Sequence, residues 1–157
     1  MVNPTAARTT IAERLPLRAT WIVAGTTLVY DFSRAQRPLA PLPPEAVSEP
    51  DEGWKAARAG LLIFGEYDYA EGGGAKPWLG IRQEDGAVFE LDGEREEQTS
   101  FLNSSLEQFI ATFEALHPFL SAGEALPPAI ETTLRDLDSQ YSASQWQGLV
   151  SFLQATE

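Results

Sequence analysis

Apolar positions along the chain change from the spacing of strands to the spacing of helices. Residues 19–32 and 60–102 carry β-branched and aromatic runs that are broken by glycines and by Asp-Gly pairs. Residues 104–155 instead repeat apolar side chains at intervals of three and four. Strands followed by helices, without regular alternation between them, predict an α+β fold. We expect a twisted antiparallel sheet of about five or six strands with helices packed on one face.

The N-terminal third is expected to form a short helix and a hairpin. Residues 5–14 predict a weak helix that ends at Leu15, because a residue before proline disfavours helical backbone. Gly25 divides residues 19–32 into two strands or introduces a bulge. Five prolines in residues 38–50 predict a loop on the surface. Residues 51–59 are expected to form a short helix.

The sheet is expected to occupy residues 60–102. Asp85-Gly86 indicates a hairpin turn, and residues 67–74, which end in three glycines, predict a loop. The run at residues 94–97, in which three of the four residues are acidic, predicts a solvated connection to the last strand. The predicted strands cover residues 60–65, 77–82, 87–91 and 99–102.

The junction at residues 99–109 predicts a strand that runs directly into a capped helix. Ser104 with Glu107, or Ser105 with Gln108, has the spacing of a capping box. The helix is expected to reach about Leu120, and further helices are predicted from Pro127 and after Ser142. We expect Phe101, Leu106 and Phe109 to point into the core, and the whole of residues 1–157 to form one domain.

The charge and composition of the chain restrict the kinds of molecule that it is expected to bind. The formal net charge is −12, and an acidic protein repels phosphate backbones, so nucleic acid is not an expected partner. The acidity favours a basic partner or serves solubility alone. There is no cysteine, which excludes disulfides and thiolate chemistry. No apolar run is long enough for a membrane span and no signal peptide is apparent, so we expect a cytoplasmic protein.

No pattern for catalysis, cofactor binding or metal binding stands out. The single His117 has no histidine or cysteine near it in sequence, which favours a structural role. Glu66, Asp68 and Glu71 lie around two tyrosines and could form a glycosidase-like acid pair, although a solvated acidic segment is the simpler interpretation. The glycines at 72–74 are not followed by the helix that phosphate-binding loops require.

Residues 60–116 resemble the SUKH superfamily, specifically its fourth subgroup of bacterial immunity proteins. The most distinctive match is the string FLNSSLEQF at residues 101–109. It is accompanied by the strand that ends in Phe64-Gly65, the strand at Ile81 and the hairpin at residues 86–88. Leu15-Pro16 after a short helix and the C-terminal residues 134–138, followed by Trp146 and Leu149, are also similar.

This resemblance implies a protein without enzymatic activity or cofactor that binds and neutralises a bacterial toxin encoded beside it. The resemblance also implies that the toxin can be a nuclease or another enzyme that modifies nucleic acid, and an acidic binder suits a basic face on such a toxin. Two alternatives stay open: a regulatory domain that binds a cellular protein, and a small hydrolase that uses the carboxylates above. Acidic residues and two tyrosines at one end of the sheet are the expected partner-binding residues, namely Glu66, Tyr67, Asp68, Tyr69, Glu71, Asp85, Glu94, Glu96 and Glu97.

Overall fold

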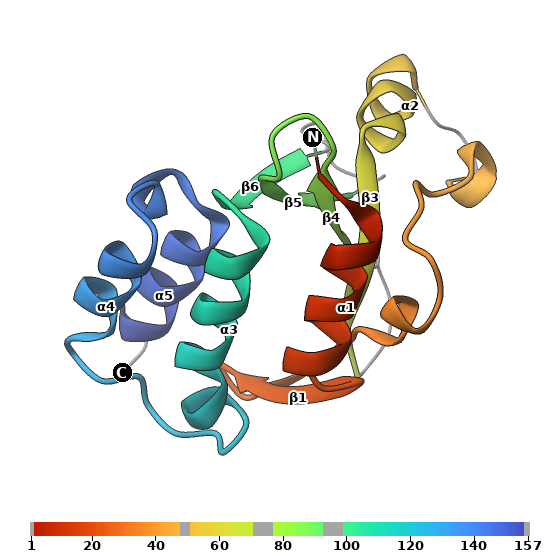
Figure 1. Cartoon of the computed structure of the whole chain (residues 1–157). Helices are drawn as coiled ribbons and strands as arrows, with labels where there is room; N and C mark the ends of the chain where they lie inside the picture. The colour runs from red at the N-terminus through yellow and green to blue at the C-terminus, as the bar shows by residue number, and fades with distance from the viewer. Residues whose placement is uncertain (1, 48–50, 71–76, 93–98, 156–157) are drawn as a thin grey trace.

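The computed structural model describes residues 2–47, 51–70, 77–92 and 99–155. Within these residues it confirms the predicted α+β fold, with helices packed on a six-stranded antiparallel sheet (Figure 1). The strands are β1 (Arg18–Val23), β2 (Thr26–Asp31), β3 (Leu61–Tyr69), β4 (Trp78–Arg82), β5 (Val88–Leu91) and β6 (Thr99–Asn103). The helices are α1 (Pro4–Arg14), α2 (Glu52–Ala59), α3 (Leu106–Leu120), α4 (Ile130–Leu137) and α5 (Gln145–Ala155), with 3₁₀ turns η1 (Ser33–Gln36), η2 (Pro44–Ala46) and η3 (Tyr141–Ala143).

The sheet is a meander in which the strands lie in chain order from β1 to β6. Val23 pairs with Thr26, so β1 and β2 are joined by a two-residue turn. Both turn residues have positive φ, 51° at Ala24 and 79° at Gly25, which is the type I′ geometry that matches the twist of a hairpin. Gly25 therefore separates two strands, as one of the two sequence-based alternatives predicts. The predicted turn at Asp85-Gly86 is also present between β4 and β5.

Strand β3 is longer than the sequence predicts. It continues through residues 67–69, where Tyr67 pairs with Tyr30, and Tyr69 pairs with Leu28. The expected loop is therefore wrong for residues 67–69, because β2 supplies a pairing partner for this polar stretch. Residues 71–74 of the same expected loop lie outside the described residues.

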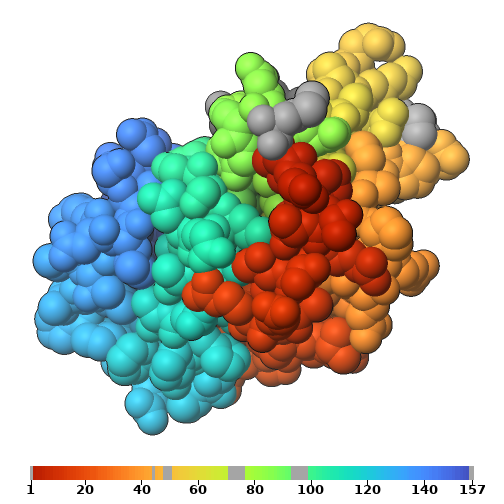
Figure 2. Space-filling model, viewed as in Figure 1, coloured from red at the N-terminus to blue at the C-terminus, as the bar shows by residue number. Residues whose placement is uncertain are grey.

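One face of the sheet, here called the inner face, packs against α1, α3 and α5. Its core is aromatic: the rings of Trp21 and Phe113 stack with centroids 4.8 Å apart. Arg14 of α1 joins α3 through Glu107 and Glu114, at 2.5 and 2.8 Å, and Figure 2 shows the two helices meeting over this face. Large aromatic side chains in this core include Trp21, Tyr30, Phe32 and Phe64 on the sheet side and Phe109, Phe113 and Trp146 on the helix side.

The opposite face, here called the outer face, has a smaller core. Trp54 of α2 is 1% exposed and belongs to a second cluster with Leu61 and Ile63, so one short helix covers part of the side away from α3. Phe101 contacts Phe89 on this side, with ring centroids 5.8 Å apart, and is half-buried. The expectation that Phe101 points into the main core is wrong, because strand alternation turns it to the outer face.

The observed helix starts agree in part with the starts predicted from the sequence. Ser105 Oγ accepts a hydrogen bond from the backbone N–H of Gln108, so Ser105 is the cap of α3. The predicted starts of the last two helices are shifted: α4 begins at Ile130, and α5 is capped by Ser144, whose Oγ accepts from the N–H of Trp146. Ser142 is not that cap, because it lies inside η3. Among the described residues, no helix combines the length and hydropathy needed to span a bilayer.

Candidate functional site

Strand alternation divides the patch that the sequence predicts around residues 66–69. Glu66 and Asp68 lie opposite Asp31 and Val29 on the outer face. Tyr67 and Tyr69 take the alternate positions, and Tyr67 packs against the inner core. Strand alternation therefore places the carboxylates and the tyrosines on opposite faces of the sheet, although all four residues line one hollow at the end of β3.

The outer ends of β1, β2 and β3, together with the turn η1, form what we call the charged strip, made of Arg18, Asp31, Arg34, Glu66 and Asp68. Arg18 lies 3.6 Å from Asp31, and Arg34 lies 4.0 Å from Glu66. A hollow of about 320 Å³ opens between these strands, lined by members of the strip and by Tyr69. The strip presents charges of both signs to a partner, with one more acid than base.

The carboxyl of Asp31 is held in its charged form. Burial alone raises its pKa, but hydrogen bonds from the side chain and backbone of Ser33, together with Arg18, outweigh burial and lower the pKa below its ordinary value. The N–H of Ser33 donates to Asp31 Oδ1 at 2.8 Å. A general acid needs a raised pKa, so Asp31 is poised for an ionic contact and not for proton donation.

Asp85 also belongs to a local structure. It accepts from Arg82 Nε at 2.9 Å, and its second oxygen contacts the same guanidinium. Arg82 and the N–H of Ala87 hold the pKa of Asp85 at about 2. The side chain lies in the β4–β5 turn on the outer side of the sheet, away from the charged strip.

The Tyr67 side chain points to the inner face, where its hydroxyl is hydrogen-bonded. Its hydroxyl donates a 2.6 Å hydrogen bond to Glu90 Oε1 on β5. Burial, followed by the charge of Glu90, raises the pKa of Tyr67 above its ordinary value. Tyr69 is 47% exposed and is the better candidate for an aromatic contact. The remaining expected residues, Glu71, Glu94, Glu96 and Glu97, lie outside the described residues.

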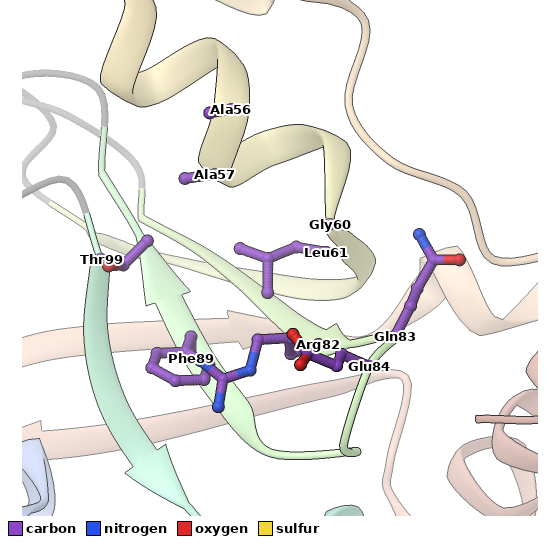
Figure 3. Close-up of a pocket in the computed structure, with 9 residues that line it drawn as sticks. All are labelled: Ala56, Ala57, Gly60, Leu61, Arg82, Gln83, Glu84, Phe89 and Thr99. Atoms are coloured by element: carbon purple, nitrogen blue, oxygen red, sulfur yellow. The ribbon is translucent and has the colours of Figure 1, made fainter. Parts of the chain in front are cut away.

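Sequence reasoning missed a groove between α2 and the outer face of β4 and β5. It measures about 610 Å³, and Ala57 and Leu61 point across it toward Phe89 (Figure 3). The guanidinium carbon of Arg82 lies 4.6 Å from the centre of the Phe89 ring. The sequence did contain an indication that the outer face is partly covered. The continuous apolar run at residues 61–64 implies burial on both faces of this strand.

His117 has a structural partner. Its Nδ1 accepts a 2.9 Å hydrogen bond from Trp21 Nε1, and its ring stacks on Phe113. No group of three or more His, Cys, Asp or Glu side chains with metal-binding geometry occurs within the described ranges. The indole of Trp21 thus fixes which nitrogen of His117 acts as the acceptor.

Comparisons with known proteins give no relative. No family model, no curated protein and no solved structure matches this chain.

Proposed function

We propose that this chain is an immunity protein that binds a basic surface of a cognate bacterial toxin and neutralises it in the cytoplasm of the producing cell. Support comes from the resemblance of residues 101–109 to that class and from the charge of the chain. The fold adds a rigid sheet whose outer face is covered only in part by α2.

The distribution of charge is the observation that carries the proposal. Residues 1–44 have a net charge of +3, and residues 45–157 have −15. Within the described residues, three of the five arginines of the first segment face acids of the same chain. Arg14 contacts Glu107 and Glu114, Arg18 contacts Asp31, and Arg34 contacts Glu66. The chain therefore keeps a large negative field that attracts a basic protein and accelerates its association.

We assign the contact to the charged strip. Asp31, Glu66 and Asp68 are half-buried on strands that hold them in fixed register. Side chains on a sheet lose less freedom on binding than side chains on a loop, so the ion pairs that they form with a partner are better preorganised. Tyr69, at the rim of the same hollow, supplies an aromatic contact.

The two alternatives predict different results. A hydrolase that uses Glu66, Asp68 and Glu71 would lose turnover of its substrate when Glu66 or Asp68 is substituted, without loss of the fold. A regulatory domain would bind a cellular protein without protecting cells from a toxin. Gene neighbourhood and a protection assay therefore separate the proposal from both alternatives.

The test is co-expression of the full chain with the product of the neighbouring gene. We expect that product to inhibit growth when expressed alone, and growth to be restored by this chain through a complex that is isolated by size-exclusion chromatography. Association should slow as salt rises, because the ionic attraction is screened. A neighbour that is not toxic, or a toxic neighbour that is not bound, contradicts the proposal.

A pair of matched variants locates the surface. Glu66→Gln with Asp68→Asn removes two charges from the charged strip, and Glu13→Gln with Glu124→Gln removes two exposed charges elsewhere. We expect the first pair to weaken binding by about tenfold or more, and the second to change it about twofold at most. Equal effects of the two pairs would assign the attraction to net charge and remove the charged strip from the proposal.

A further inference from the structure

A pocket of about 160 Å³ lies on the inner face, between the sheet and the start of α5. Its volume corresponds to roughly five water molecules, which is enough for one small polar head group. It is separate from the charged strip, although Tyr67 and Tyr69 line both hollows. The side chains that give the pocket its chemistry are Tyr30, Tyr67, Tyr69, Glu90 and Trp146.

Glu90 lies in the wall of this pocket and is 3% exposed. It lies opposite Leu79 in the sheet, and its Oε1 accepts from the Tyr67 hydroxyl at 2.6 Å. Among the described residues that line the pocket, Glu90 supplies the one carboxyl group. A carboxylate in a site with few water molecules attracts a cation more strongly than a surface carboxylate does.

Aromatic rings and aliphatic side chains form the other walls. Tyr30 and Tyr67 have ring centroids 5.2 Å apart. Trp146 is held in place by its own Nε1–H, which donates to Asn103 at 2.7 Å. The faces of such rings are electron-rich and attract cations within about 6 Å of the ring centre. The negative field inside the pocket also acts on the tyrosines, since burial and then the charge of Glu90 raise the pKa of Tyr30.

We propose that this pocket binds a cationic head group, either a substituted ammonium or a guanidinium, between the tyrosine rings and the Glu90 carboxylate. Tyr69 and Gln145 are the exposed residues of the pocket lining, and Tyr69 lies at the same end of the sheet as the charged strip. The head group comes either from a free organic cation or from a lysine or arginine side chain of a bound protein. The proposal does not depend on the proposed function, because binding of a free cation needs no toxin.

The direct test is titration of the full chain with two pairs of probes. One pair is choline and its neutral isostere 3,3-dimethyl-1-butanol, and the other is N-acetylarginine amide and N-acetylcitrulline amide. Binding is followed by isothermal titration calorimetry and by the indole N–H resonance of Trp146. We expect a cation that binds, whether choline or N-acetylarginine amide, to bind at least about tenfold more tightly than its neutral isostere.

The pattern across the pairs identifies the source of the head group. Preference for choline indicates a free organic cation, and preference for the arginine derivative indicates a protein side chain. Equal binding of a cation and its neutral isostere would overturn the proposal, because the pocket would then recognise only shape. The absence of a saturable shift with either cation at about 10 mM would also overturn it.

Variants connect the binding to Glu90. Glu90→Gln removes the charge and keeps an oxygen that accepts from Tyr67, so we expect the fold to persist and cation binding to fall by about tenfold or more. Glu13→Gln is the matched control, because Glu13 is an exposed acid on α1 that does not line the pocket, and it should bind as the parent does. Tyr69→Ala changes an exposed ring and should weaken binding several-fold without loss of fold. Unchanged cation binding in Glu90→Gln would contradict the assignment.

Discussion

The indole Nε1–H of Trp146 donates a 2.7 Å hydrogen bond to the side-chain oxygen of Asn103. Through this bond α5 is attached to the end of β6. The amide nitrogen of Asn103 in turn donates to Thr112 of α3 at 3.1 Å and to Asp138 at 3.2 Å. One asparagine side chain therefore joins the last strand to three segments of the helical layer.

Asp138 completes this buried group. Its carboxylate accepts from the backbone N–H of Ser104 at 2.8 Å, from the Ser104 hydroxyl at 2.7 Å and from the N–H of Gln140 at 3.0 Å. The serine next to the α3 cap is thus used for a contact between β6 and the residue that follows α4. The distinctive Asn103-Ser104-Ser105 string is explained by this hydrogen-bonding and by capping, and not by a binding role.

Asn103→Ala should destabilise the fold. The change leaves the buried Trp146 N–H without its acceptor and removes a donor to Asp138, which we expect to lower the free energy of unfolding by about 2–4 kcal/mol. Urea denaturation measures the difference. Asn3→Ala, which removes an exposed helix cap, should cost about 1 kcal/mol. A loss at Asn103 no larger than the loss at Asn3 would contradict the role given to this side chain.

Asp138 should make stability depend on pH in the acid range. Burial raises its pKa, but the hydrogen bonds from Ser104, Gln140 and Asn103 outweigh burial, so the folded pKa lies below the ordinary value of 3.8. A lowered folded pKa stabilises the protein above pH 3.8, and this contribution is lost as pH falls through the folded pKa.

The comparison of the parent with Asp138→Asn isolates this contribution from other acids. We expect the variant to be less stable by about 2 kcal/mol near neutral pH, and the gap to narrow below pH 3.8. Urea unfolding at neutral pH and at the lowest pH where the parent is folded gives both values. A gap that widens on acidification would show that the pKa is raised.

Gly65 should not tolerate a side chain. A Cβ there would lie 2.7 Å from Phe32 Cδ1 and 3.1 Å from the backbone oxygen of Asp31, so Gly65→Ala should destabilise by about 1–3 kcal/mol. Gly148 is the matched control, because a Cβ on this α5 residue meets nothing within 4 Å. Gly148→Ala should stabilise by about 0.5–1 kcal/mol through helix propensity. Thermal unfolding of the two variants should shift in opposite directions.

Tyr67 and Tyr69 should respond differently to loss of the hydroxyl. Tyr67→Phe removes a donor from the buried Glu90, and we expect a loss of about 1–3 kcal/mol. Tyr69→Phe should stay within about 0.5 kcal/mol of the parent, because this side chain is half-exposed. Guanidinium denaturation checks both. Similar small effects would show that the Tyr67 hydroxyl contributes little to the inner core.

Much of the fold follows from local sequence. Gly25 and Asp85-Gly86 mark turns because few residues accept the backbone angles that these turns require. The end of β3 could not be predicted in this way, since residues 67–69 form a strand only through pairing with β2. Local composition contains no information about that partner.

The candidate site was less predictable than the fold. Glu66 and Asp68 were identified as surface acids, but their separation from Tyr67 depends on the strand continuing past Gly65. The sequence did not indicate the pocket around Glu90, because a single acidic residue in an apolar strand is typical of an exposed position at the edge of a sheet. Only the register of β3, β4 and β5 turns it inward beside Tyr67.

The chain order of the strands has a consequence for synthesis. Each strand from β2 onward finds its partner in the strand made immediately before it, so the sheet assembles from contacts of short sequence separation. The helices α3 and α5, which cover Trp21, Tyr30 and Phe64, are translated last. A nascent sheet therefore has an aromatic face that only α1 covers until the final third of the chain leaves the ribosome, and this is the stage at which chaperones would protect it from aggregation.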